Sequence, residues 1–340
     1  MEFARVALMP FVLPRGIAAR RLFDCRNAGL TSFLLRTIRC DIMTDMTSRR
    51  KTLKHDWFDN QPGAWVMVML PAVAGFFIGG PNLDTLWLLA TWAVCYCVQF
   101  SAAHWFKAHF SRRYLPPMLT YAVALIVIGL PFLITHTGIL RWAPLYIVLV
   151  ALSMLSSWLR KERSLWGNAV AVLATSMMAV VIASFGDRLL PLCRAGSQVS
   201  CDAVAQYRQG IRALPDWRSW ADVQAWWPAY SVPKAALTAA IVFALTQYGS
   251  VLFVKTMIRE YGKRSYLVAS WVWHAALAIT GFAVNMWLGV VAVVLLTRSV
   301  AIPLRFRGQR RPKPMIAGVT EAMCLLLVFI AVIIICPHLA

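Results

Sequence analysis

Nine apolar runs dominate this sequence, and each is long enough to cross the hydrocarbon core of a bilayer as a helix. Hydrophobic residues make up 60% of the chain and charged residues 14%, which excludes a soluble enzyme or a disordered chain. Two runs around Asn285 also fit one long broken helix, which would leave eight spans. The predicted fold class is all-α, a polytopic membrane helical bundle of about nine transmembrane helices, at residues 64–80, 86–106, 118–134, 142–158, 165–185, 235–254, 266–282, 287–304 and 315–336.

The basic residues divide unevenly between the two sides of such a bundle. If the nine runs alternate in direction, 27 of the 34 Lys and Arg residues fall on one side, Arg298 among them. The positive-inside rule then places the N-terminus in the cytoplasm and the C-terminus outside. Most of the net charge of +20 is explained by this topology, so the expected partner is the lipid bilayer and not nucleic acid.

Two segments lie outside the regular pattern of spans. Residues 1–57 form a basic cytoplasmic head before the transmembrane bundle of residues 58–340. We interpret residues 1–42, which are rich in Arg and poor in acidic residues, as the product of a mis-called start, with a targeting peptide as the alternative. The second segment, residues 186–232, is a long external loop.

The external loop contains the only candidate disulfide that the sequence suggests. Cys193 and Cys201 lie on the side of the membrane predicted to be oxidising, where disulfides persist. Four tryptophans between residues 217 and 227 predict either an amphipathic segment at the outer interface or a helix packed over the end of the bundle. Both interpretations stay open at this point.

Cations gather where the second, fourth and sixth runs end on the cytoplasmic side. Lys255 and Arg259 are four residues apart and share one face of a helix, so together they could bind one anionic group. Arg suits phosphate through its planar fork, and Lys acts as a point charge. The alternative is that these residues only snorkel to the interface. The predicted anion-binding set is Lys107, Arg112, Arg113, Arg160, Lys255, Arg259 and Arg264.

No motif for nucleotide, metal or hydrolase chemistry accompanies these cations. The acidic residues expected on the same side are Asp56, Asp59, Glu162 and Glu260, and they are not clustered as a magnesium site requires. We therefore predict no metal and no cofactor. Glu162 and Glu260 are the only nearby candidates for a general base, and each could instead pair with adjacent cations. Catalytic residues stay unassigned, and so does the question of whether the chain is an enzyme.

Several stretches resemble the YwiC-like family of bacterial membrane proteins. They are residues 60–67, running into Leu70-Pro71, then 112–117, 160–165, 247–249 and 254–260. The resemblance covers about residues 55–300, and it implies a multi-pass protein of the bacterial inner membrane without an assigned reaction. Its motif residues are Asn60, Gln61, Gly63, Trp65, Tyr248 and Glu260.

A more distant resemblance is to the UbiA-type intramembrane prenyltransferases. That family implies nine helices and functional motifs in the cytoplasmic loops after helices two and six, which is where two similar basic tails occur here. The prenyltransferases carry aspartates at those places to hold magnesium and a prenyl diphosphate. This chain carries Lys and Arg instead, so direct ionic contact with a head group would have to replace the metal.

Three functions are consistent with these features. The first is a binder of an amphipathic anionic ligand, a lipid phosphate or isoprenoid diphosphate, which it could also transfer or modify. The second is a small-anion transporter that uses the same cations. The third is a non-catalytic membrane subunit or assembly factor, whose protein partner the sequence does not identify.

Overall fold

The computed structural model describes residues 57, 62–161, 163–188, 201–214, 226–227, 231–306 and 314–338. The predicted head, apart from Trp57, lies outside the described residues. Asn60, Gln61, Glu162 and Cys193 lie outside them too, as does the side chain of Cys201. The boundary between head and bundle and the Cys193–Cys201 disulfide therefore stay predictions.

The described part of the chain is all-helical, as predicted, and contains no strand. Eight helical segments are long and apolar enough to cross a membrane, and α3 is a shorter apolar helix. Together they occupy the nine predicted places. The apolar helices are α3 (Pro62–Gly79), α4 (Leu83–Lys107), α5 (Leu115–Thr135), α6 (Ala143–Trp158), α7 (Leu165–Ser184), α10 (Lys234–Val254), α11 (Arg264–Val284), α12 (Met286–Arg305) and α13 (Pro314–Ile335).

Local sequence signals begin these helices where the polar connections end. The Asn82 side chain accepts a hydrogen bond from the Thr85 backbone N–H, and Thr85 accepts one from the Asn82 N–H, which together form a capping box before α4. The Ser164 side chain caps α7 by accepting a bond from the Gly167 N–H. Each cap satisfies backbone donors that the helix itself leaves unpaired.

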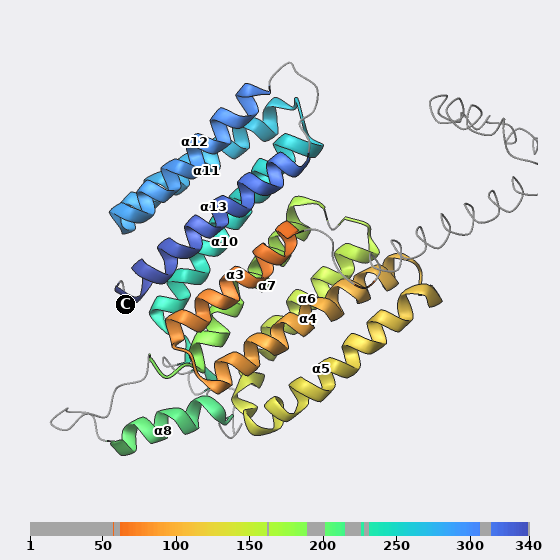
Figure 1. Ribbon diagram of the computed structural model, residues 1–340, viewed down its shortest axis with the longest axis vertical. Helices are drawn as coiled ribbons and strands as arrows, with labels where there is room; N and C mark the ends of the chain where they lie inside the picture. Colours follow the sequence, from red (N-terminus) through yellow and green to blue (C-terminus); the bar gives the residue numbers. More distant parts are fainter. Residues whose placement is uncertain are drawn as a thin grey trace, which may run out of the picture. The chain divides into compact units, whose positions relative to one another are not determined.

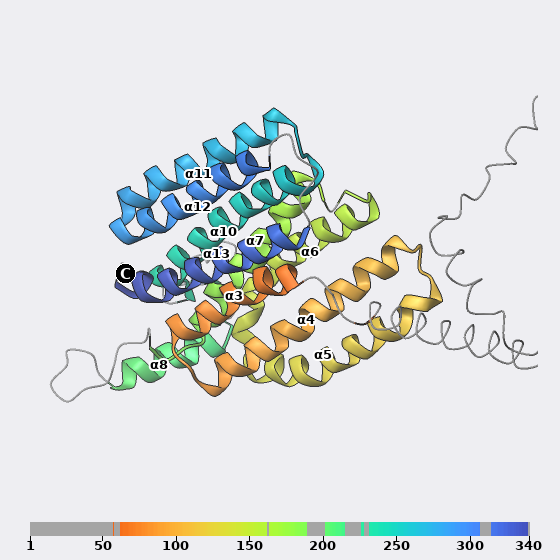
Figure 2. The same cartoon turned by 45° about the horizontal axis from the view of Figure 1, so that its top comes forward.

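Asn285 separates two helices instead of interrupting one. Its backbone is extended, and its side chain accepts a hydrogen bond of 2.9 Å from the Trp287 N–H to begin α12. Helices α11 and α12 then lie side by side as a hairpin (Figures 1 and 2). The eight-span alternative is therefore wrong, because a single residue reverses the chain direction at this point.

Small residues let the central helices approach closely. A Cβ atom added to Gly75 of α3 would lie 2.4 Å from the Ala179 carbonyl oxygen of α7, and one added to Gly79 would lie 2.7 Å from Ala183. These two pairs repeat at a spacing of four residues, the pattern of small residues that packs helices inside membranes. By contrast, α5 exposes large apolar residues such as Ile126 and Val127, which is the surface expected against lipid.

Consecutive apolar helices alternate in direction, so their connections collect at two ends (Figure 1). We call one end the loop face, formed by the α4–α5, α6–α7 and α10–α11 connections and by the adjoining ends of α12 and α13. The opposite end is the α8 end, where a short helix, α8 (Cys201–Arg212), lies against the bundle. The loop face is the end that the distribution of Lys and Arg assigns to the cytoplasm.

Candidate functional site

Side-chain contacts join the basic connections of the loop face. An Arg160 guanidinium nitrogen lies 3.5 Å from His109 Nε2, which links the α6–α7 and α4–α5 connections. The Lys255 ammonium donates a hydrogen bond of 2.5 Å to the Arg163 carbonyl oxygen, which adds the α10–α11 connection. The Tyr261 hydroxyl donates to the Phe306 carbonyl oxygen at the end of α12. Connections far apart in the sequence therefore form one continuous face.

The predicted cations occupy different environments on this face. Arg112 and Arg113 form the short helix η1 (Arg112–Tyr114) and are exposed, as are Arg160 and Arg264, while Lys107 ends α4 half-buried. The Arg113 guanidinium lies 5.6 Å from the centroid of the Tyr114 ring. The structure thus presents exposed guanidinium groups from three connections at one end of the bundle.

Lys255 and Arg259 do not sit on an ordinary α-helical turn. The segment η5 (Lys255–Arg259) is a π-helical turn, a rare insertion that often marks functional sites. Lys255 is only 7% exposed and lies 6.0 Å from the Tyr266 ring centroid, whereas Arg259 is exposed. The two cations, predicted as equal partners on one face, therefore differ: one is an internal anchor and the other is at the surface.

Three residues with positive φ shape the first two connections. His109 and Phe110 have φ of 50° and 62°, and Arg160 has φ of 54°. Arg160 ends α6 in the left-handed position that glycine usually fills, and the Lys161 N–H donates to the Ser156 carbonyl oxygen as in a Schellman motif. Non-glycine residues in this conformation are uncommon and concentrate at functional sites.

An aromatic cluster lies beside these left-handed residues. The Phe110 ring contacts Trp105, Phe106 and Trp158, with centroid distances of 4.8, 5.3 and 6.2 Å. Phe110 and Trp158 are 46% and 52% exposed, so the cluster presents an apolar surface next to the Arg160–His109 contact. Cations and exposed aromatic rings side by side suit a ligand with a charged head and an apolar tail.

The candidate base Glu260 is engaged by a neighbouring cation. The Lys263 ammonium lies 2.6 Å from its carboxylate, and this hydrogen bond holds the pKa of Glu260 below its ordinary value. The same contact raises the pKa of Lys263. A carboxylate stabilised as an anion is a weaker base, so this geometry favours a pairing role for Glu260 over proton abstraction.

The described motif residues of the predicted family have mostly structural surroundings. The Trp65 and Tyr248 rings pack edge-on against Tyr96 and Trp273. Gln247, beside Tyr248, is fully buried and donates a hydrogen bond of 2.9 Å to the Met67 carbonyl oxygen. That bond joins two motif stretches 180 residues apart, so these residues hold α10 against α3.

A buried ion pair joins α12 and α13, and the sequence-based prediction for Arg298 was wrong. Arg298 was counted with the cytoplasmic loops, but it lies inside α12, and its Nη1 donates a hydrogen bond of 2.6 Å to Glu321 of α13. Both side chains are only 6% exposed. An Arg and a Glu inside long apolar runs were the available signal, because charges at membrane depth are costly without a partner.

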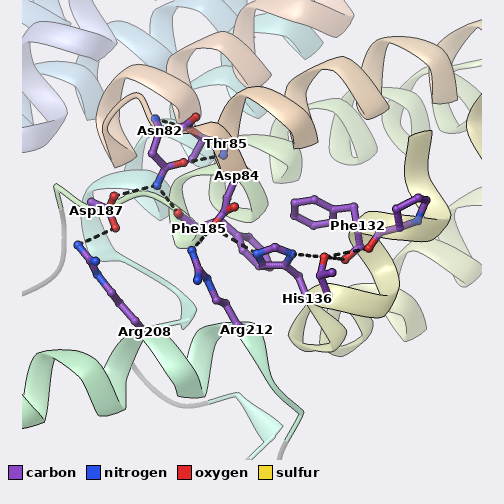
Figure 3. Close-up of polar contacts among 11 residues, drawn as sticks. Asn82, Asp84, Thr85, Phe132, His136, Phe185, Asp187, Arg208 and Arg212 are labelled. Atoms are coloured by element: carbon purple, nitrogen blue, oxygen red, sulfur yellow. Dashed lines mark hydrogen bonds and ion pairs between the residues drawn. The ribbon is translucent and has the colours of Figure 1, made fainter. Parts of the chain in front are cut away.

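A second polar cluster, at the α8 end, was also missed (Figure 3). Asp84, in the first turn of α4, lies 3.3 Å from His136 Nε2 and 2.5 Å from Arg212 of α8. Asp187 pairs with Arg208 at 3.1 Å and accepts a hydrogen bond from Asn82. The His136 ring stacks on Phe132 with an interplanar angle of 12°. Two aspartates therefore hold two arginines that lie four residues apart on α8.

A buried arginine completes the attachment of α8. Arg141, 2% exposed, donates hydrogen bonds to the carbonyl oxygens of Gly210 and Ala213. The Trp226 indole N–H donates to the Arg141 carbonyl oxygen, and the Trp227 ring lies 6.3 Å from that of Trp142. The described part of this loop, α8 with Trp226 and Trp227, therefore packs over the end of the bundle. Trp217 and Trp220 lie outside the described residues, so both interpretations of the tryptophan segment stay predictions.

No group of three His, Cys, Asp or Glu side chains within the described ranges is placed to hold a metal ion. The described side chains of the loop face offer cations, aromatic rings and hydrogen-bond donors. Such a set can bind and orient an anion, and Glu260 is the only described carboxylate in its connections.

Comparison with known proteins agrees with the predicted family. Residues 58–183 match the family model described as "YwiC-like protein", which confirms the resemblance over the motif stretches up to residue 165. The blocks at 247–249 and 254–260 lie beyond the matched residues. An "Uncharacterized protein" of Haemophilus influenzae is 22% identical over 247 residues, which are 72% of this chain and 86% of the relative. No solved structure matches the chain. Similarity to the UbiA-type prenyltransferases stays a prediction.

Proposed function

We propose that this integral membrane protein binds the anionic head group of an amphipathic ligand at its loop face, such as a lipid phosphate or an isoprenoid diphosphate. The observation that carries the proposal is the pair of contacts from Arg160 to His109 and from Lys255 to Arg163, which assemble three basic connections. Transfer or modification of the ligand would be a further step on the same site.

The charge balance of the loop face supports an anionic ligand. The described residues of its connections, 108–114, 159–161, 163–164 and 255–263, include eight Lys and Arg residues and one acidic residue, Glu260. Glu260 already pairs with Lys263. Phosphate groups suit this role, since guanidinium forks bind two of their oxygens at once.

Lys255 would couple ligand binding to the arrangement of the connections. Its ammonium has three donors, and one of them bonds the Arg163 carbonyl oxygen. An anion that approaches Lys255 would therefore contact the group that holds the α6–α7 connection against the π turn. The exposed rings of Phe110 and Trp158 lie next to Arg160 and would receive the first carbons of the tail.

Native mass spectrometry of the full chain in mild detergent tests this proposal, with phosphatidic acid and farnesyl diphosphate as probes. The test variant Arg112→Ala/Arg113→Ala/Arg160→Gly removes exposed cations and keeps the left-handed turn at position 160. We expect a loss of affinity of at least about tenfold, since a charge-assisted hydrogen bond contributes about 1.5–3 kcal/mol and 1.4 kcal/mol is tenfold.

The matched control is Arg188→Ala/Arg208→Ala/Arg212→Ala, which removes the same number of cations from the opposite end. We expect it to bind both probes as the wild type does. Equal losses in both variants would show that binding follows net charge alone, and absence of probe binding by the wild type would overturn the proposal. Lys255→Met, which keeps an unbranched side chain one atom shorter, tests the anchor separately, with thermal unfolding as the check on folding.

A further inference from the structure

The structure points to a second, intramembrane site: we propose that Arg298, Glu321 and His274 together bind one oxyanion and one proton. The proposal does not depend on the loop face. Arg298 lies seven residues before the end of α12, and Glu321 lies seven residues after the start of α13. At about 1.5 Å per residue, the pair is about 10 Å below the loop face.

Arg298 has one guanidinium edge that does not bond Glu321. Only Nη1 bonds Glu321, while Nε and Nη2 are buried and have no nitrogen or oxygen partner among the described residues, and the Cys324 thiol is close to the same guanidinium. Nε and Nη2 form the edge of a guanidinium that binds two oxygens of a carboxylate or phosphate side by side. The face of the same group lies 4.2 Å from the Phe253 ring centroid, which fixes its plane.

Two buried hydrogen-bond acceptors lie near this arginine. Glu321 Oε1 and His274 Nε2 are buried, and within the described part of the chain neither has a partner. His274 Nδ1 lies 2.7 Å from the Ser270 carbonyl oxygen, so Nδ1 carries the ring proton and Nε2 offers a lone pair. Trp271, one turn before His274 on α11, donates a hydrogen bond of 2.9 Å to the carbonyl oxygen of Ser299, the residue after Arg298. His274 Nε2 lies 3.2 Å from the position of a Cβ added to Gly249, which is one turn before the Phe253 that packs on the Arg298 guanidinium.

The net charge of the site determines what must bind together with an anion. Arg298 and Glu321 sum to zero, so an added anion would leave a net negative charge at membrane depth, which is strongly unfavourable. A proton taken from solvent by Glu321 Oε1 or His274 Nε2 restores neutrality. Anion and proton would therefore bind together: Arg298 Nε and Nη2 are two donors for the anion, and Glu321 Oε1 and His274 Nε2 are the two alternative acceptors for the proton.

Few other titratable groups face this site. Cys324, one turn after Glu321 on α13, faces Arg298. On the neighbouring α10 and η5 segments, Tyr248 packs on Trp273 and the Lys255 ammonium bonds Arg163. Helix α3, which also packs against α13, carries no titratable side chain. Proton uptake at this site is therefore assigned to Glu321 or His274.

Isothermal titration calorimetry of the full chain in phosphatidylcholine nanodiscs tests the proposal, with sodium formate and sodium nitrate as probes. Titrations in two buffers of different ionisation enthalpy count the protons taken up with each anion. We expect about one proton per anion and binding that weakens as the pH rises. Phosphatidic acid added to the discs separates the sources: if a lipid head group is the occupant, it displaces the free anions.

Four variants test the separate roles of Glu321, His274 and Arg298. Glu321→Gln mimics the protonated carboxyl, so it should bind the anion with proton uptake near zero, and His274→Asn decides which group takes the proton. Arg298→Lys keeps the charge without the fork and should bind at least about tenfold more weakly. The doubly neutral Arg298→Gln/Glu321→Gln, whose side chains can still bond each other, is the folded control without a site.

Three results would overturn the proposal. The first is absence of binding by the wild type of formate, nitrate and phosphatidic acid alike. The second is anion binding by the wild type without proton uptake. The third is undiminished binding by the folded double variant, which would place the anion elsewhere.

Discussion

The two ends of the bundle use arginine in opposite ways. At the α8 end, Arg208 and Arg212 meet aspartates and Arg141 meets backbone carbonyl groups, so each cation holds one segment of the chain to another. At the loop face, Arg112, Arg160 and Arg264 are exposed in connections that contain few acids. The same residue type thus fastens a helix at one end and offers charge to a ligand at the other. Partner geometry, not residue identity, makes the difference.

Among the variants that test this comparison, Arg141→Met should cause the largest loss of stability. The change removes two charge-assisted hydrogen bonds to Gly210 and Ala213 and leaves two carbonyl groups to find other donors, so we expect a loss of stability of about 3 kcal/mol. Unfolding of the purified protein in detergent measures the loss. Arg188→Met, which removes one exposed bond to the Phe77 carbonyl, is the control and should change stability by less than about 1 kcal/mol. Equal losses would contradict the fastening role of Arg141.

A smaller effect is expected from Asp84→Asn. Asn keeps the shape but loses the charge that holds both His136 and Arg212, so stability should fall by about 1–2 kcal/mol and hydrogen exchange in α8 should rise. Asp187→Asn is the matched variant. Its carboxylate is 49% exposed and should contribute about 0.5 kcal/mol or less. Unchanged exchange in α8 of the Asp84 variant would show that the aspartate does not hold this helix.

Arg160→Gly tests whether an arginine of the loop face stabilises the fold. A left-handed conformation costs a non-glycine residue about 1–2 kcal/mol, partly offset by the greater freedom of glycine in the unfolded chain, so we expect a gain of about 0.5 kcal/mol. Lys161→Gly, one residue later, does not relieve a positive φ and should lower stability slightly. If Arg160→Gly instead destabilised the protein, the guanidinium would be holding the fold, as it does at the α8 end.

The smallest expected effect is the contribution of the Glu260–Lys263 pair to the pH dependence of stability. The pKa of Glu260 is lowered in the folded protein, so its contribution to stability is present above its ordinary pKa of about 4.3 and is lost as the pH falls further. The pKa of Lys263 is raised, so its contribution is lost only as the pH rises beyond about 10.4. Glu260→Gln should flatten the acid side of a stability profile. An unchanged profile would show that the exposed pair contributes nothing.

Much of the fold could be predicted because its causes are local. Apolar runs long enough to span a bilayer must form helices to satisfy their backbone groups, so nine runs predict nine helices. The ambiguity at Asn285 could not be settled in this way, because an asparagine between apolar runs fits both a kink and a turn. The structure resolves it through the extended backbone and the cap on Trp287.

The candidate sites were only partly predictable. Excess cations at the ends of apolar runs showed which connections are basic, and the loop face contains them. The contact from Lys255 to Arg163 joins residues 92 positions apart, and that from Arg212 to Asp84 joins residues 128 apart. No spacing rule connects such residues, since it is helix packing that brings them together. The Arg298–Glu321 pair was missed because Arg298 lies close enough to a run's end to pass for a loop charge.

The sequence alone determined that this is a multi-pass membrane protein, how its helices alternate and which end is basic, because hydrophobic length and charge distribution act directly through the bilayer. Only the tertiary structure decided which arginines are exposed, which fasten α8 and which lies buried beside Glu321. Side-chain partners depend on contacts across helices, and those contacts follow from the close packing of small residues such as Gly75 and Gly79 against α7.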